Sequence, residues 1–480
     1  MPKKKPQRAA PDRLHTRARG SAVLDSFLGK PLALISLLLA VFAVAQAWSY
    51  AGSQVCIDYY QFWAVGRVLH ESGVRDVYSD AERRSIGKMM WEKARAQVGP
   101  DAQAKAASKR YQAALYRQTL ETYSTPWLYT CFALLSSGDY DRDQNLFQYF
   151  CLICYVLAVV GMCNILGYSP GSTALAVASF LYWFGPTVSD TDVGNINRLE
   201  LAILALFLWM QRSDRPAAWQ CLLSGILLGS GVMFKPNLGF VVLILLLGWL
   251  VFRCHRKLVL TAAGMALGCL ASFAISAAYF HSMRPWLDWA KELPRLMNEL
   301  DIPLSHGNYA LARLVAGIFG FRPSLVLPPL FIGSVVIVLL RAGFAGNGLQ
   351  IPGSPKQADR KPSLKLDVLL IGLGGTVSLL SAQLAWLHYY LLTMPLALYL
   401  LRPGESEGTK LSTGRRVLRW LALLAVLMIA LEPFKAIFNL TAAGGKAALV
   451  SGGAILLFTL ALLDCLSCFQ GSALKPGLSH

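Results

Sequence analysis

Long apolar runs alternate with short polar segments along most of this chain, and their lengths are those of membrane-spanning helices. Many runs hold about 17 or more residues with little or no charge, enough to cross the hydrocarbon core as a helix. The pattern predicts an all-α polytopic membrane protein with about 12 transmembrane helices. The expected spans are 31–50, 145–166, 172–187, 199–211, 217–234, 238–252, 258–280, 325–341, 366–383, 386–401, 420–438 and 447–464. The apolar pieces 125–135 and 309–320 are too short to cross, and the second is expected to be re-entrant or interfacial.

Basic residues cluster beside these runs and orient the chain. The clusters are Lys3–Lys5 with the arginines up to Arg19, Arg253–Lys257, Lys356–Lys365 and Arg415–Arg419. Because Lys and Arg are enriched in cytoplasmic loops, the clusters predict that both termini are cytoplasmic. The first run is long and lacks a cleavage site, so we expect an uncleaved helix and not a signal peptide. The predicted regions are a disordered basic cytoplasmic tail (1–30), a transmembrane core (31–402) and a C-terminal pair of spans with a tail (403–480).

A large polar insert follows the first span and belongs to the loop 51–143. Its apolar residues recur at helical spacing, first from Ile86 to Ala94 and again from Tyr111 to Leu120. This spacing predicts amphipathic helices. If span one runs outward, the loop is extracytoplasmic, and its helices are expected to lie on the membrane surface.

Composition excludes several classes of function. Of 480 residues, 55% are hydrophobic and only 15% are charged, whereas a soluble domain carries about 25% charged residues. The formal net charge of +18 is explained by the orienting clusters and not by nucleic-acid binding. The ten cysteines fall mostly in apolar runs, so neither a disulfide framework nor a zinc site is expected. The sequence has no phosphate-binding glycine loop of the Walker or GxGxxG type.

The topology was derived from apolar runs and basic clusters, and it places most of the other notable polar residues on one side of the membrane. Asp58, Asp190, Asp192, Asn195, Lys235, His306 and His388 all lie in outer loops or at the outer ends of spans. Ionisable groups at membrane depth are costly and tend to mark function, so this grouping predicts one outward-facing cavity. The acids Asp190 and Asp192 are of a type that binds hard cations, but two acids in a turn are more often solvated, and we expect no metal site.

Asp58 is the candidate general base, because it is an acid at the membrane surface beside aromatic residues that partly desolvate it. Tyr59 and Tyr60 suit stacking on a sugar. The alternative is an ordinary loop aspartate beside interfacial aromatics.

Cationic and imidazole side chains are the candidates for binding phosphate. Lys235 and Arg198 are suited to a phosphate group, although a lysine at a helix end also snorkels to the interface without any other role. His388, flanked by Trp386 and Tyr389, can donate to phosphate, and the alternative is a satisfied interfacial histidine. Asn308 either shapes the cavity or caps a helix.

Several of these positions form an ordered series of motifs. The series comprises Asp58-Tyr59-Tyr60, Ser124-Thr125-Pro126-Trp127, Gly194-Asn195-Ile196-Asn197, the span with Gly225 and Gly229 that ends in Lys235-Pro236, Asn308-Tyr309-Ala310, and Ser381 to Tyr389. In their order and spacing they resemble glycosyltransferase family 87 over roughly residues 31–402. The family's usual Gln is Asn195 here, and its second His is Tyr389.

This resemblance implies a GT-C-like bundle and an inverting sugar transfer from a polyprenyl-phosphate donor, with mannose favoured. Asp58 would deprotonate a hydroxyl of a lipid or glycan acceptor, and His388 with Lys235 would bind the donor phosphate. The remaining substrate-binding residues would be Arg198, Asn195, Asn197, Tyr59, Tyr60, Tyr389, Trp386 and Asn308. No cofactor is implied, and the site would face the periplasm from the inner membrane. The rival function is a transporter or flippase for a lipid-linked glycan, which would show internal repeats and polar groups at the bilayer midplane.

Overall fold

The structure, a computed structural model, describes residues 16–72, 76–213, 216–299, 302–320, 323–347, 364–403, 413–438 and 442–470. Predictions for residues 1–15, for most of the basic stretch at 356–365, and for 404–412 and 471–480 fall outside these residues. Helices make up nearly all of the described chain, which contains no strand. The expected all-α class is therefore confirmed.

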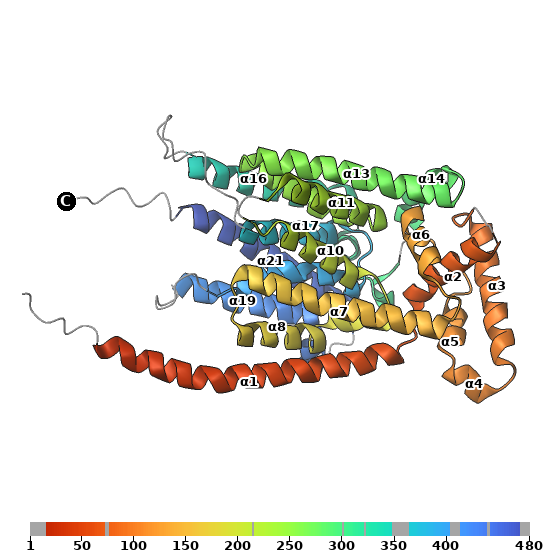
Figure 1. Ribbon diagram of the computed structural model, residues 1–480, viewed down its shortest axis with the longest axis horizontal. Coiled ribbons are helices and arrows are strands. Elements are labelled where there is room, and N and C mark those ends of the chain that lie inside the picture. Colours follow the sequence, from red (N-terminus) through yellow and green to blue (C-terminus); the bar gives the residue numbers. More distant parts are fainter. Residues whose placement is uncertain are drawn as a thin grey trace, which may run out of the picture.

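Most of these helices run side by side in one elongated bundle (Figure 1). The bundle contains α1 (Thr16–Ser53), α7 (Tyr140–Leu166), α8 (Pro170–Tyr182), α9 (Gly185–Val193), α10 (Asn197–Met210), α11 (Ala218–Phe234), α12 (Leu238–Val251), α13 (His255–Tyr279), α14 (Arg284–Glu299), α15 (Leu311–Phe319), α16 (Leu327–Asn347), α17 (Leu364–Ser381), α18 (Met394–Leu401), α19 (Thr413–Ala430), α20 (Glu432–Phe438) and α21 (Ala443–Gln470). Short 3₁₀ helices complete it: η1 (Leu304–His306), η2 (Pro323–Leu325) and η4 (Leu387–Thr393).

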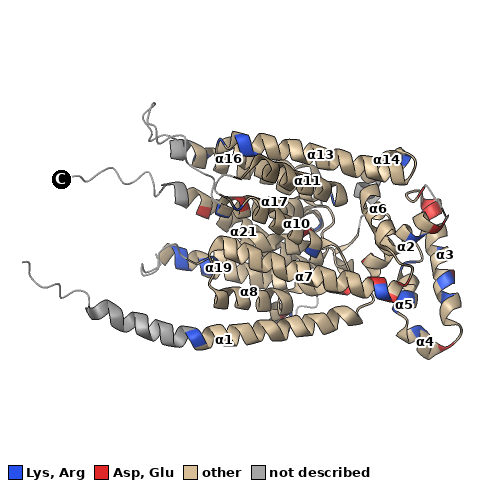
Figure 2. Cartoon of the chain, in the orientation of Figure 1, with Lys and Arg blue, Asp and Glu red and all other residues tan. Residues whose placement is uncertain are grey.

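Five described helices are long and apolar enough to cross a membrane. They are Lys30–Ser53 of α1, α7, α13, α17 and Ala443–Ser467 of α21. The bent pair α9 and α10 would count as a sixth, and five shorter apolar helices lie beside them. Figure 2 shows charged residues concentrated toward the two ends of the bundle, with few in its middle. The chain is thus a helical membrane protein, and the number of about 12 spans stays a prediction.

The insert forms a second unit at one end of the bundle, which we call the cap (helices α2 to α6). Its helices are α2 (Ile57–Ser72), α3 (Asp80–Val98), α4 (Ala102–Ala107), α5 (Lys109–Tyr116) and α6 (Pro126–Leu135). The predicted amphipathic helices exist, but their apolar faces pack on α2. Ile86, Met90 and Ala114 are buried in a hydrophobic core that belongs to the cap. Their apolar residues therefore cover one another, and contact between these helices and the membrane surface stays a prediction.

Three further predictions differ from the structure. The helix of the first span already begins at Thr16, inside the tail expected to be disordered. The expected span 172–187 ends at Tyr182, and a new helix starts at Gly185 with Pro186 in its first turn, where proline suits a helix start. The expected span 386–401 is a 3₁₀ helix followed by a short α-helix. Each break leaves two pieces that are too short to cross a membrane alone.

Glycines let α11 and α13 approach closely. A Cβ at Gly225 or Gly229 would collide with the backbone of α13, and a Cβ at Gly264 or Gly268 would collide with the backbone of α11. Both helices thus carry glycines four residues apart at their interface, the pattern that favours close packing in membranes. This contact fixes α11, whose end presents Lys235.

Candidate functional site

Asp58 lies in the first turn of α2, directly beyond the C-terminal end of α1. Its side chain is 15% exposed, so it is shielded but reachable. Oδ1 accepts a hydrogen bond from Arg117 Nη2 at 2.9 Å, and Oδ2 accepts one from Asn195 Nδ2 at 2.8 Å. Both carboxylate oxygens are therefore engaged, one by the cap and one by the bundle.

A sharp bend between α9 and α10 brings Asn195 to Asp58. The two helices meet at 117°, and Gly194 ends α9 in the left-handed conformation with φ +68. A Cβ at Gly194 would lie 2.7 Å from Cys56 Cβ and 2.9 Å from Tyr59 Cβ, so only glycine fits. Most of the segment 188–198, between the expected spans 172–187 and 199–211, is therefore helical, and only its centre turns.

Lys235 lies on the other side of Asn195. Its Nζ donates to Asn195 Oδ1 at 3.3 Å and to Asn197 Oδ1, and it lies 3.5 Å from Glu200 Oε2. The ammonium also lies 4.5 Å from the ring centroid of Tyr389. Its side chain remains 17% exposed. The ammonium of Lys235 and the carboxylate of Asp58 are thus connected through a single residue, Asn195, to which both are hydrogen-bonded.

His388 approaches Asp58 from η4. Its Nε2 lies 3.9 Å from Asp58 Oδ2, and its side chain is only 5% exposed. Among the described residues, this nitrogen has no hydrogen-bond partner. The sequence-predicted residues Asp58, Asn195, Asn197, Lys235, His388 and Tyr389 therefore converge from segments far apart in the chain.

Two charged residues in this group were not predicted, namely Arg117 and Glu200. Arg117 follows α5 in the polar insert, where one arginine among many gives no distinguishing signal. Glu200 is fully buried in the first turn of α10. An acid inside an otherwise apolar run was a usable signal for Glu200, because such a residue needs a cationic partner. We refer below to the Asp58 cluster, which comprises Asp58, Arg117, Asn195, Asn197, Glu200, Lys235, His388 and Tyr389.

Arg198 is not accessible to a substrate. It is fully buried, and its Nε donates to Asp190 Oδ2 at 2.7 Å while Nη2 donates to Gln148 Oε1 at 2.6 Å. Asn197 Nδ2 donates to the other oxygen of Asp190 at 2.8 Å. This ion pair joins α7, α9 and α10 beneath the Asp58 cluster, and we assign it a structural role.

Tyr59 and Tyr60 point into the cap core and away from the Asp58 cluster. Tyr59 packs on Phe132 and Phe147, and Tyr60 packs on Tyr140. Burial raises the pKa of both phenols above the ordinary value, so they stay protonated at neutral pH. The geometry does not support sugar stacking by these two rings.

Asn308 joins two of the predicted motifs through the backbone. Its Nδ2 donates to the carbonyl oxygens of Ile302 and Gln383, and its Oδ1 accepts from the N–H groups of Ala310 and Ala385. The bonds to Gln383 and Ala385 hold the segment that leads to Trp386 and His388, so Asn308 positions that segment. Two other polar residues of the predicted cavity lie elsewhere: His306 is exposed beside Ser305, and Asp192 accepts a hydrogen bond from Tyr50.

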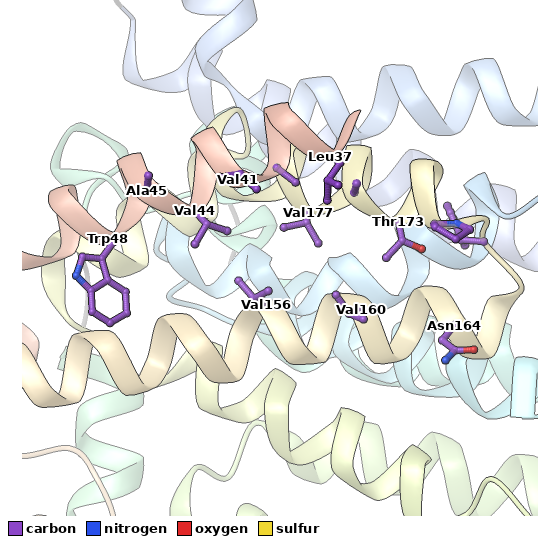
Figure 3. Close-up of a pocket in the computed structure, with 14 residues that line it drawn as sticks. Leu37, Val41, Val44, Ala45, Trp48, Val156, Val160, Asn164, Thr173 and Val177 are labelled. Atoms are coloured by element: carbon purple, nitrogen blue, oxygen red, sulfur yellow. The ribbon is translucent and has the colours of Figure 1, made fainter. Parts of the chain in front are cut away.

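An apolar groove of about 970 Å³ runs along the bundle between α1, α7 and α8. Figure 3 shows Val44, Val156 and Val177 lining its centre, with Trp48 at one end and Asn164 near the other. Trp48 stacks on Tyr149 near the C-terminal end of α1, the end that leads to Asp58. The groove has the composition expected for contact with a hydrocarbon chain.

The described residues contain no group of three His, Cys, Asp or Glu side chains that is suited to hold a metal ion. The Asp58 cluster instead combines a reachable carboxylate with two cationic side chains and an imidazole. A carboxylate can accept a proton from a hydroxyl, and neighbouring cations can stabilise a departing oxyanion. These are the requirements of a group transfer to a hydroxyl.

Fold and cluster together define a helical membrane protein with an ionisable centre at one end of its bundle. Residues 124–350, slightly less than half of the chain, match the family model described as glycosyltransferase family 87. This match supports membership of the family and indicates a glycosyltransferase. The matched segment contains Asn195 and Lys235 but neither Asp58 nor His388. No curated protein and no solved structure gives a match.

Proposed function

We propose that the protein transfers a hexose, with mannose favoured, from a polyprenyl-phosphate donor to a hydroxyl of a lipid or glycan acceptor. The observation that carries the proposal is the juxtaposition of a carboxylate and a cation within one partly exposed cluster. Asp58 and Lys235 share Asn195 as a hydrogen-bond partner, and His388 lies 3.9 Å from Asp58. The site is proposed to face the periplasm from the inner membrane.

In the proposed mechanism, Asp58 is the general base. The acceptor oxygen attacks the anomeric carbon while Asp58 takes its proton, and the bond from that carbon to the phosphate oxygen breaks. The electron pair leaves with the polyprenyl phosphate, which gains one negative charge. Lys235 and His388 are placed to stabilise this charge. Because one displacement occurs, the anomeric configuration inverts.

The isoprenoid tail of the donor needs an apolar surface beside the cluster. The groove between α1, α7 and α8 offers one, and its Trp48 end lies on the helix that leads to Asp58. The groove thus supports a lipid-borne donor over a soluble nucleotide sugar.

The rival function, transport of a lipid-linked glycan, has less support. A transporter is expected to hold its polar site near the bilayer midplane. Here the Asp58 cluster includes Arg117 of the cap and residues at helix ends, so it lies at one end of the bundle. This position favours a reaction at the membrane surface.

A reconstitution assay tests the proposal. The purified protein in lipid vesicles is given polyprenyl-phosphate mannose, or the glucose analogue, together with lipid-borne and glycan acceptors. We expect a product with inverted anomeric configuration from at least one donor. Movement of the lipid-linked sugar across the bilayer without transfer, or no transfer from any donor, would refute the function.

Replacing Lys235 with Met is expected to lower kcat/KM for the donor by about 10²–10³-fold, the usual cost of one oxyanion-stabilising donor. Steady-state kinetics over a range of donor concentrations measures this. Lys257→Met is the matched control, because Lys257 also pairs with a carboxylate and lies 4.6 Å from the ring centroid of Trp249. Equal losses in the two variants would contradict the role of Lys235.

The orientation has its own test in cysteine labelling. Lys88 lies on α3 of the cap with a side chain that is 78% exposed, and Gly414 is exposed at the start of α19. We expect an impermeant maleimide, added to spheroplasts, to label Lys88→Cys at once and Gly414→Cys only after permeabilisation. The reverse pattern would place the cap in the cytoplasm.

A further inference from the structure

Arg117 lies just after α5, and the cap contributes it to the Asp58 cluster together with Asp58 of α2. Its Nη2 donates to Asp58 Oδ1 at 2.9 Å, and its Nη1 lies 2.9 Å from Glu121 Oε1. The side chain is 16% exposed, and its Nε is buried without a hydrogen-bond partner among the described residues. Arg117 is therefore shared between two carboxylates and still has an unused donor.

The contact between Arg117 and Asp58 competes with the proposed role of Asp58 as the general base. A general base must present a free lone pair to the hydroxyl proton that it accepts. Asp58 instead has Arg117 at 2.9 Å and Gln61 at 3.5 Å on Oδ1, and Asn195 on Oδ2. Asn195 is fixed from behind, since its Oδ1 accepts from Ile196 N at 2.8 Å and from Lys235. Arg117 is the charged donor of the three, and its bond to Oδ1 is shorter than that of Gln61, so turning Arg117 toward another anion would expose most of this oxygen.

The charges of the proposed reaction move away from Asp58 and toward the phosphate. Before transfer, Asp58 carries one negative charge and the donor phosphodiester carries one. After transfer, Asp58 is protonated and neutral, while the polyprenyl phosphate is a monoester with up to two negative charges. A cation between the two loses its attraction to Asp58 at the moment when the phosphate gains charge. Arginine also suits phosphate better than lysine, because its planar fork forms two hydrogen bonds at once.

We propose that Arg117 is a phosphate-binding residue that covers Asp58 in the empty site and turns to the donor phosphate when the donor binds. This inference rests on the proposed function and adds an arginine to Lys235 and His388 as groups that bind the donor phosphate. Donor binding then uncovers Oδ1 of Asp58 for the acceptor hydroxyl. The donor therefore binds before the acceptor. In the enzyme without donor, Arg117 covers Oδ1 of Asp58.

The orphaned donors of the cluster fit an anionic ligand. Arg117 Nε and His388 Nε2 are both buried and both lack a hydrogen-bond partner within the described chain. They belong to the residues on opposite oxygens of Asp58: Arg117 is bonded to Oδ1, and His388 lies near Oδ2. Leaving such groups unpaired is costly, and a phosphate has enough oxygens to satisfy both.

Inhibition by farnesyl phosphate, a short analogue of the leaving group, tests the inference. In Arg117→Met, we expect its Ki and the donor KM to rise by about 10- to 100-fold, as for the loss of a hydrogen bond to a charged group. Arg117→Lys should recover part of this affinity, since it keeps the charge but not the fork. Arg67→Met is the control: Arg67 is 17% exposed and pairs with Glu71, so it matches Arg117 in burial and partner type. Arg117→Gln carries the same expectation and replaces the Met variant if that variant does not fold.

Two outcomes would overturn the inference while leaving the proposed function intact. One is active transfer in which Arg117→Met or Arg117→Gln keeps the wild-type Ki and donor KM within about twofold, well below the tenfold change expected for a lost charged contact. The other is a wild-type enzyme in which farnesyl phosphate competes with the acceptor and not with the donor, because donor-first binding requires the reverse. An absence of transfer by the wild-type protein would refute the proposed function itself.

Discussion

Asp58→Asn is expected to slow sugar transfer by about 10²–10⁴-fold, the usual contribution of a general base. The amide has the shape of the carboxylate but does not accept the acceptor proton. Because Lys235 and His388 remain, the donor is still bound, so kcat falls much more than the donor KM rises. Transfer rates at saturating donor measure the effect.

The control for this variant is Asp192→Asn. Asp192 lies on the neighbouring helix α9 and accepts a hydrogen bond from Tyr50, and it makes no contact with Asp58. This substitution is expected to leave transfer near the wild-type rate. A comparable loss in both variants would mean that the region tolerates no change of charge, and Asp58 would lose its special role.

Arg198→Met is expected to lower the free energy of unfolding by about 3–5 kcal/mol, because it leaves a buried charge without its partner. Asp190 is fully buried, and Arg198 Nε lies 2.7 Å from its Oδ2. Removing the guanidinium also takes away the donor to Gln148 Oε1, which accepts a hydrogen bond from Arg198 Nη2. The loss spreads across α7, α9 and α10, the helices that hold Asn195 and Asn197.

Thermal unfolding of the detergent-solubilised protein measures this loss. The double variant Arg198→Met with Asp190→Leu removes both charges and is expected to recover a large part of the stability, since it leaves no unpaired ion. A single variant as stable as the wild type would contradict the structural role of the pair. That result would instead favour the substrate-binding role that the sequence predicts for Arg198.

Apolar run length predicted the helices of the bundle well, because a long uncharged stretch has few alternatives to a membrane helix. The runs at 145–166, 258–280 and 447–464 correspond to α7, α13 and α21. Breaks inside runs escaped prediction. The break at 183–184 is set by Pro186 and by packing, and hydropathy alone does not register it. The cap core was also missed, since an amphipathic helix has the same pattern whether it covers another helix or a membrane.

The site could be predicted in part, because ionisable residues at span ends are few and their sidedness follows from the topology. This brought Asp58, Asn195, Lys235 and His388 together before any coordinates. Sidedness says nothing about which way a side chain points, so Tyr59 and Arg198 were placed in the site although they are buried in packing. Arg117 was beyond prediction, because only the folded cap selects it from its basic neighbours.

A single-turnover experiment tests the central claim most directly. The protein is loaded with labelled polyprenyl-phosphate sugar, mixed rapidly with acceptor, and quenched over a range of times. The account predicts that wild type forms product in one exponential phase, and that Asp58→Asn retains the bound donor while its phase slows by about 10²–10⁴-fold. Product formation by Asp58→Asn at the wild-type rate would contradict the assignment of Asp58 as the base.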